Sequence, residues 1–215
     1  MIDRRPRYRA NGVTLPEVLT AAIVLAVIVG SVSAIYAAAM RGWYTGASLT
    51  YAEQKASWVI QRMAPDIQQA LSITPASSPY DTLCIAAQLP AKAYDSYSGV
   101  YLNQVSTDAD GKPYLIPGNY TVYYRGDEYG NLDLDGDRIW RRLTLPDGTL
   151  IKQQEIVDNV VDNPDDGTGN PKPMFIYWPD IYRLRSVEVT VTVEETRGHR
   201  TATASMTGEL TLRNN

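Results

Sequence analysis

The 215-residue sequence has one cysteine, one histidine and one phenylalanine. A single cysteine, Cys84, cannot form a disulfide within the chain, and it excludes a zinc site built from several cysteines. A single histidine, His199, excludes most metal triads and most histidine-based catalysis. Cys84 lies between Leu83 and Ile85 and is expected to be a small buried side chain. His199 follows Gly198 and is expected in a hairpin turn.

Basic charge and the motifs of common enzymes are also scarce. The formal net charge is −4 and the isoelectric point is near 5.0. This balance argues against nucleic-acid binding, because phosphate contacts need a basic surface. The sequence has no serine in a G-x-S-x-G elbow and no glycine-rich phosphate loop. We therefore expect no enzyme activity, no cofactor and no nucleic-acid partner.

The N-terminus combines a basic segment with a long apolar run. Four arginines stand among the first nine residues, ahead of a stretch without charge from Val18 to Met40. As a helix, those 23 residues rise about 34 Å, enough to cross a hydrocarbon core of about 30 Å. The positive-inside rule then keeps the N-terminus in the cytoplasm and leaves the rest of the chain outside.

Three interpretations of this segment are open: a cleaved secretory signal, a plain signal anchor, or a membrane segment with a more specific function. The run is longer than the roughly 7–15 apolar residues of a signal peptide. Glu17 stands at its entrance. A carboxylate costs a few kcal/mol at the bilayer centre and is a functional candidate there, whereas in the interface it costs little. The position of Glu17 alone favours neither case.

The residues around Glu17 carry a resemblance to a known family. Asn11-Gly12-Val13-Thr14-Leu15-Pro16-Glu17 resembles the processing motif of type IV prepilins. The resemblance implies that prepilin peptidase cleaves after Gly12 and methylates the new N-terminus, Val13. It also implies that Glu17 meets the free amine of a neighbouring subunit, because opposite charges attract strongly in an apolar medium. Val13 departs from the pattern, since major pilins usually carry phenylalanine there.

Beyond Met40 the helical pattern continues as an amphipathic helix with one apolar stripe. The stripe consists of Ala52, Ala56, Val59, Ile60, Met63, Ile67, Ala70 and Leu71. A turn-rich segment at 72–79 follows, and the remainder predicts strands. The expected strand segments are 82–87, 120–125, 138–145, 187–193 and 201–212, and 150–161 is expected to be a strand, or a strand and a short helix. The sequence thus predicts an α+β fold, in which a long N-terminal helix packs on an antiparallel β-sheet domain.

The order of these segments resembles minor pilins and pseudopilins of the J/W type. The chain has a tyrosine-rich segment (YTVYY), an arginine-bearing one (IWRRL), a valine-rich one (VEVTVTV) and a final TLRNN. Outside the first 40 residues the resemblance is one of pattern. It implies a protein that initiates or caps a pilus-like filament. Such a filament serves a type IV pilus, type II secretion or DNA uptake, and the sequence does not choose among these.

This resemblance implies four segments. They are a cleaved basic leader (1–12), a transmembrane and filament-core helix (13–41), its amphipathic continuation (42–72) and an extracytoplasmic β-rich domain (73–215). The implied partners are prepilin peptidase, other pilin or pseudopilin subunits and the bacterial inner membrane. Loss of the leader removes four basic and one acidic residue, from 20 and 24 to 16 and 23, so the mature chain carries −7.

One loop has the spacing of candidate metal ligands. Asn131, Asp133, Asp135 and Asp137 alternate around Gly136, as in the first half of a calcium loop. The glutamate expected six residues after the glycine is missing, because Arg142 stands there. Aspartate, asparagine and glycine are also typical of a soluble hairpin turn. Structural calcium and a solvated loop are both open.

Two functions of different classes follow from the sequence. The first is a structural minor pilin or pseudopilin, with Gly12, Val13 and Glu17 as its processing and assembly residues. The second is a membrane-anchored extracytoplasmic domain that binds a ligand or acts as an enzyme, with a passive anchor. The missing catalytic residues count against the second.

Overall fold

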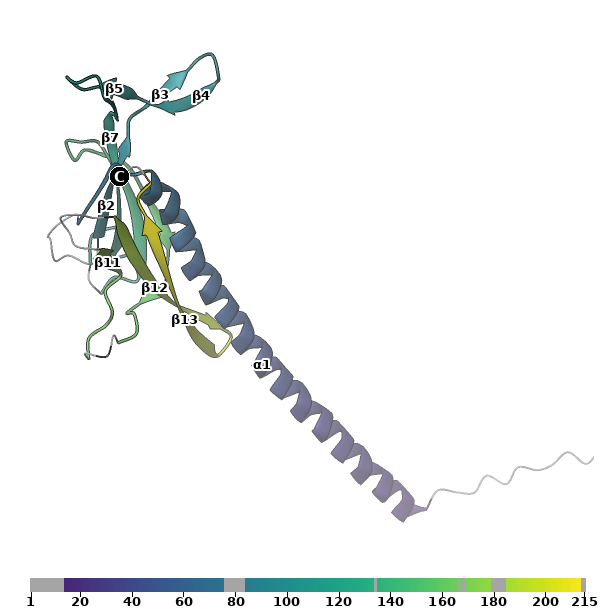
Figure 1. Cartoon of the computed structure of the whole chain (residues 1–215). Coiled ribbons are helices and arrows are strands. Elements are labelled where there is room, and N and C mark those ends of the chain that lie inside the picture. The colour runs from purple at the N-terminus through teal and green to yellow at the C-terminus, as the bar shows by residue number, and fades with distance from the viewer. Residues whose placement is uncertain are drawn as a thin grey trace, which may run out of the picture. The chain divides into compact units, whose positions relative to one another are not determined.

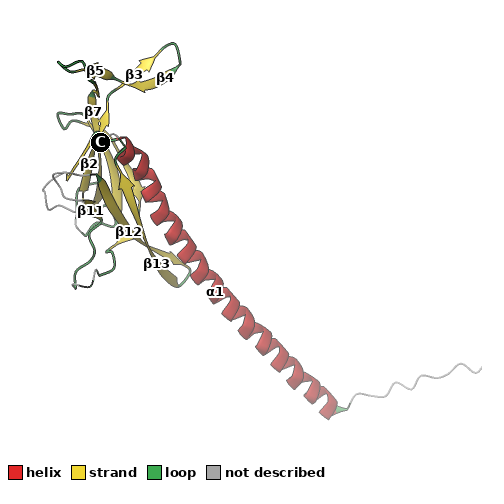
Figure 2. Ribbon diagram, viewed as in Figure 1, coloured by secondary structure: helices red, strands yellow, loops and turns green. Residues whose placement is uncertain are grey.

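The computed structural model describes residues 14–75, 84–133, 135–165, 167, 169–178 and 185–213. The chain divides into two compact units, Met1–Tyr44 and Thr45–Asn215. Figures 1 and 2 show one long helix and a set of β-strands. The expected α+β class, with a long apolar N-terminal helix and an antiparallel β-sheet domain, is therefore confirmed.

The helix, α1, extends from Leu15 to Gln69 and contains 55 residues. Its buried residues repeat every three or four positions along the second unit, as a single stripe requires. They are Ser48, Ala52, Ala56, Val59, Met63 and Ile67. The apolar stripe expected from the sequence is thus confirmed from Ala52 to Ile67, with Ser48 added at its start, whereas Ala70 and Leu71 lie beyond the end of the helix.

Five antiparallel strands form the larger sheet, in the order β1-β2-β7-β8-β9. Their bounds are Ser72–Pro75, Cys84–Pro90, Pro117–Gly126, Arg138–Thr144 and Leu150–Val157. Residues 72–79 were expected to be a turn, but Ser72–Pro75 form strand β1. The reason is that Ile73 is buried and pairs with Ala87 of β2.

The smaller sheet is built around the long hairpin of β12 (Ser186–Arg197) and β13 (Arg200–Thr211). Strands β10 (Val160–Val161) and β11 (Phe175–Trp178) pair with the other edge of β12. The valines at 187, 189, 191 and 193 are fully buried, as their alternation predicts. His199 lies in the turn after Gly198, which confirms that prediction.

Two short hairpins project from the chain between β2 and β7 (Figure 1). One joins β3 (Lys92–Asp95) to β4 (Val100–Asn103), and the other joins β5 (Val105–Thr107) to β6 (Pro113–Leu115). Most of their residues are exposed. Backbone hydrogen bonds among Ala91, Gln104 and Ile116 join the bases of the two hairpins.

The core lies between α1 and the inner faces of the two sheets. It combines side chains of the α1 stripe with side chains from both sheets. They include Ala56, Val59, Met63, Ile67, Ile85, Ala87, Tyr123, Ile139, Phe175, Val187, Val189, Val191 and Val193. Cys84 is 3% exposed, so its expected burial is confirmed. A helix that fills one side of this core is held in place along four turns of its length.

Candidate functional site

Glu17 lies in the first turn of α1, which begins at Leu15. The carbonyl oxygen of Thr14 accepts hydrogen bonds from the backbone N–H groups of Glu17 at 3.0 Å and Val18 at 3.2 Å. Pro16 suits this position, because a first-turn residue needs no N–H partner within the helix. The exposed carboxylate of Glu17 stands at the positive end of the helix dipole. Gly12 and Val13, the other two expected site residues, lie outside the described residues.

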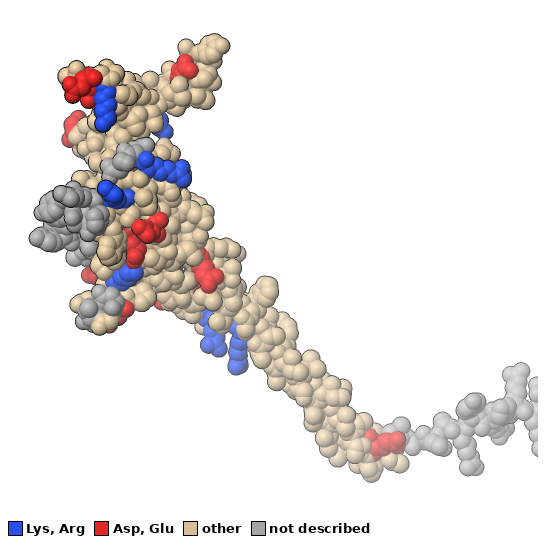
Figure 3. Space-filling view, viewed as in Figure 1, with Lys and Arg blue, Asp and Glu red and all other residues tan. Residues whose placement is uncertain are grey.

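The run that follows Glu17 leaves its aliphatic side chains exposed in the single chain. Leu15, eight residues of the 18–29 run, Val32 and Ile35 are all more than half exposed. Figure 3 shows this part of α1 as a surface without charged side chains. A contiguous apolar surface of this size marks contact with a membrane or with another protein. Within the described residues, α1 is the one helix long and apolar enough to cross a membrane.

Further along α1, Asp66 holds the helix to the centre of the larger sheet. The hydroxyl of Tyr123 in β7 donates to Asp66 Oδ2 at 2.7 Å, and Arg141 Nε in β8 donates to the same oxygen at 2.9 Å. Tyr123 is fully buried. Burial raises the pKa of Tyr123, and the nearby Asp66 carboxylate raises it further. This cluster fixes the position of α1 on the sheet.

Lys55 makes a second connection between α1 and the strands. Its ammonium group pairs with Asp158 Oδ1 at 2.5 Å and with Glu195 Oε1. Burial lowers the pKa of Lys55, but the hydrogen bonds to the two carboxylates outweigh burial and the net pKa is raised. The hydrogen bond from Lys55 in turn lowers the pKa of Asp158. Lys55 thus joins α1 to both sheets.

An open groove lies between α1 and the edge strand β9. It has a volume of about 460 Å³ and is lined by Tyr51, Gln54, Lys55, Trp58, Glu155, Ile156, Val157 and Asp158. Tyr51 and Trp58 are 46% and 47% exposed. The guanidinium carbon of Arg197 lies 4.0 Å from the centre of the Tyr51 ring, a cation–π contact.

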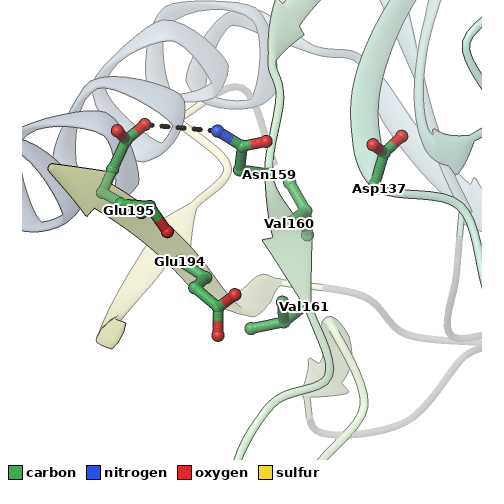
Figure 4. A pocket seen from close by; sticks show the side chains of 7 residues that line it. Asp137, Asn159, Val160, Val161, Glu194 and Glu195 are labelled. Carbon is green, nitrogen blue, oxygen red and sulfur yellow. Dashed lines mark hydrogen bonds between the residues drawn. The ribbon is translucent and has the colours of Figure 1, made fainter. Parts of the chain in front are cut away.

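A second hollow, of about 330 Å³, is lined by acidic side chains (Figure 4). Its lining includes Asp137, Glu194 and Glu195. The side-chain amide of Asn159 donates to Glu195 Oε1 at 3.4 Å, as the dashed line in Figure 4 marks. Asn159 has a φ of 59°, a left-handed conformation that asparagine tolerates better than most residues. Since Glu195 also pairs with Lys55, its carboxylate already has protein partners.

The loop with the expected calcium ligands is a hydrogen-bonded hairpin turn. Asp127 accepts from the backbone N–H groups of Tyr129 at 2.9 Å and Asn131 at 2.8 Å. A hydrogen bond from the Asn131 side chain lowers the pKa of Asp127. Asp133 accepts from the N–H of Asp135 at 3.1 Å. In the part of the chain that the structure describes, no three Asp, Glu, His or Cys side chains are grouped to hold a metal ion.

No model of a known protein family, no curated protein and no solved structure matches the chain. Glu17 and the apolar run were predicted from the sequence, whereas the clusters around Asp66 and Lys55 were not. One signal for the first cluster was present in the sequence. Arg141 falls on the inward face of its predicted strand, beside Ile139 and Leu143. A charged residue on an inward face needs a buried partner.

Proposed function

We propose that the chain is a structural subunit of a type IV pilus-like filament, a minor pilin or pseudopilin made as a prepilin. Prepilin peptidase removes residues 1–12 and exposes the amine of Val13. Before assembly, Val18–Met40 anchor the subunit in the inner membrane, and its C-terminal domain lies outside the cytoplasm. It then joins other subunits at the tip of the filament.

The observation that carries this proposal is the position of Glu17. Glu17 belongs to a segment that resembles the prepilin processing motif. It also lies in the first turn of an uninterrupted helix that contains the whole apolar run. A passive anchor does not require a carboxylate at this point, and a carboxylate drawn into hydrocarbon costs free energy unless it has a partner. In a filament, the partner is the amine of Val13 on a neighbouring subunit. Such a pair is strong in an apolar medium and sets the axial register.

The second unit supports an assembly role because it holds α1 firmly. Asp66 and Lys55 tie the helix to the sheets through charged hydrogen bonds. Charged hydrogen bonds as well as apolar packing therefore transmit a force on the helix to the β-sheet domain.

Mass spectrometry of the purified protein tests the proposal. In cells with an active prepilin peptidase, we expect a chain that starts at Val13 and carries one added methyl group. In cells without the peptidase, and in a Gly12→Val variant, the chain starts at Met1. Gly30→Ala is the matched control, because Gly30 lies inside the apolar run with open space around it. An unprocessed N-terminus in cells with active peptidase contradicts the proposal.

The alternative is a membrane-anchored domain that binds a ligand, and the groove beside Tyr51 and Trp58 is the observation that favours it. The two functions differ in what they require of Glu17. A binding domain on a passive anchor keeps its function when Glu17 is replaced, whereas a filament subunit does not.

A further inference from the structure

Strand β9 forms one edge of the larger sheet. Within the described residues it pairs with β8 on one side and with no strand on the other. An edge strand presents unpaired N–H and C=O groups, which are a template for another extended chain. The β8–β9 pairing is irregular at two points, but Lys152 to Glu155 pair regularly with β8 between them. This stretch of β9 therefore has the geometry to accept one more strand.

The open groove beside this edge has a wall that suits apolar side chains. Its α1 side consists of Tyr51, Gln54, Lys55 and Trp58, which have the i, i+3, i+4 and i+7 spacing of one helix face. Tyr51 and Trp58 are two turns apart, about 10 Å along the helix axis. Both rings are about half exposed. Half-exposed tryptophan and tyrosine offer a large apolar area and are enriched where proteins bind partners.

The groove adjoins the acidic hollow of Figure 4, because Lys55 pairs with Asp158 of the groove and with Glu195 of the hollow. Acids outnumber bases among the side chains that line these two sites or contact their lining. Five carboxylates stand against three basic groups, which leaves two negative charges: Asp137, Glu155, Asp158, Glu194 and Glu195 against Lys55, Arg138 and Arg197. Charge complementarity therefore favours a basic occupant.

We propose that the edge of β9 and the adjoining groove bind an extended segment of a partner protein that carries apolar and basic side chains. The segment pairs with Lys152–Glu155 as a sixth strand of the five-stranded sheet. It runs antiparallel to β9, since antiparallel pairs are slightly more stable than parallel ones. Main-chain hydrogen bonds supply affinity, while Tyr51, Trp58 and the carboxylates select the side chains.

The first test measures binding of a defined peptide to the full chain in detergent. The probe is an octapeptide of alternating lysine and valine, capped at both ends and labelled with a fluorophore, and fluorescence anisotropy gives its Kd. A second peptide has glutamate in place of every lysine. We expect this second peptide to bind at least about tenfold more weakly, because an exposed ion pair contributes up to about fivefold and several are reversed.

Two further measurements locate the peptide. Trp58→Ala should weaken binding by about tenfold or more, as is usual for a tryptophan at the centre of an interface. The matched control is Trp178→Ala, which removes a tryptophan of similar exposure, 52%, from β11 of the smaller sheet. Melting curves show that both variants fold. Hydrogen exchange, read residue by residue by mass spectrometry, should slow at alternate amides of β9 when the lysine peptide is added, because only alternate N–H groups face an added strand.

Tight binding of the lysine peptide that depends on Trp58 and protects β9 supports the proposal. Absence of binding below about 1 mM, equal binding of the glutamate peptide, or equal losses in the two tryptophan variants overturns it. Binding that leaves exchange in β9 unchanged also overturns it, because the peptide then contacts side chains alone. The proposal goes beyond the filament function and does not depend on it, so its failure leaves cleavage after Gly12 as a separate question.

Discussion

The hydroxyl of Tyr123 in β7 donates to the Asp66 carboxylate of α1 across 2.7 Å. The two residues are 57 positions apart in the sequence. Arg141 donates to the same carboxylate oxygen, so one acid on α1 joins two neighbouring strands. The contact lies where Tyr123 is fully buried, and loss of a buried partner is costly. The contact therefore fixes the helix to the centre of the larger sheet.

Tyr123→Phe removes this hydrogen bond without changing the shape of the core. We expect the free energy of unfolding to fall by about 1.5–3 kcal/mol, the range for a hydrogen bond to a charged group. Thermal unfolding of the full chain in detergent, followed by near-ultraviolet circular dichroism, measures the change. Tyr97→Phe is the matched control, because Tyr97 is 99% exposed. An equal effect of both substitutions argues against a special role for the bond.

The ion pair between Lys55 and Asp158 predicts a pH dependence of stability. The hydrogen bond from Lys55 lowers the pKa of Asp158 in the folded chain, whereas the unfolded value is about 3.9. The stability that Asp158 contributes is therefore complete above pH ~4 and is lost as the pH falls through the folded pKa. We expect the melting temperatures of the native chain and Asp158→Asn to converge below pH ~4.

Melting curves from neutral to acid pH test this convergence. Asp135→Asn serves as a control, since Asp135 is exposed in the β7–β8 loop. A gap between the native chain and Asp158→Asn that stays constant down to the acid limit contradicts the predicted linkage.

Gly208 marks a close approach between β13 and α1. A Cβ at this position would lie 2.8 Å from the side chain of Ile60. Gly208→Val should therefore force the strand and helix apart and cost about 1–3 kcal/mol of stability. By contrast, Gly46 lies in the helix with open space around it. Gly46→Ala should therefore stabilise the chain by roughly 0.5–1 kcal/mol, because alanine favours the helix more than glycine does. Thermal unfolding distinguishes the two, and a neutral Gly208→Val would show that the approach is not tight.

The sequence predicted the parts of the fold that have a strong period. The stripe from Ala52 to Ala70 follows the helical repeat, and Val187–Val193 follows the strand repeat. The hairpins β3–β4 and β5–β6 were not predicted, because their residues are exposed on both faces and leave no alternating pattern. The Asp66–Arg141 pair joins residues 75 positions apart, and no local pattern specifies such a partner.

The candidate site was predictable for a different reason. Glu17 stood out because a charge beside an apolar run is rare, and that rarity is visible in the sequence. The cation–π contact between Arg197 and Tyr51 was not visible in this way. Arg197 looks like an ordinary turn-flanking residue until its contact with Tyr51 places it beside α1.

The loop between β7 and β8 should not respond to calcium. The carboxylates of Asp127 and Asp133 already accept backbone hydrogen bonds within the turn. A calcium ion needs six to eight oxygen ligands, and these side chains would have to leave their donors to supply them. We expect millimolar calcium to leave the melting temperature unchanged. A rise in melting temperature that Asp133→Asn abolishes would show instead that the loop binds the ion.

Replacing Glu17 separates the two proposed functions. Glu17→Gln keeps the shape of the side chain and the start of α1, where the backbone bonds to Thr14 do not involve the carboxylate. We expect cleavage after Gly12 to proceed normally, because the peptidase acts at the leader. Incorporation into filaments should fall strongly, since an amide cannot form an ion pair with the charged amine of a neighbour in an apolar medium.

Quantitative immunoblotting of sheared filaments against the membrane fraction measures this incorporation. Thr20→Val is the control, one turn further along α1. A Glu17→Gln subunit that assembles as well as the control would favour the passive anchor and, with it, the binding-domain alternative.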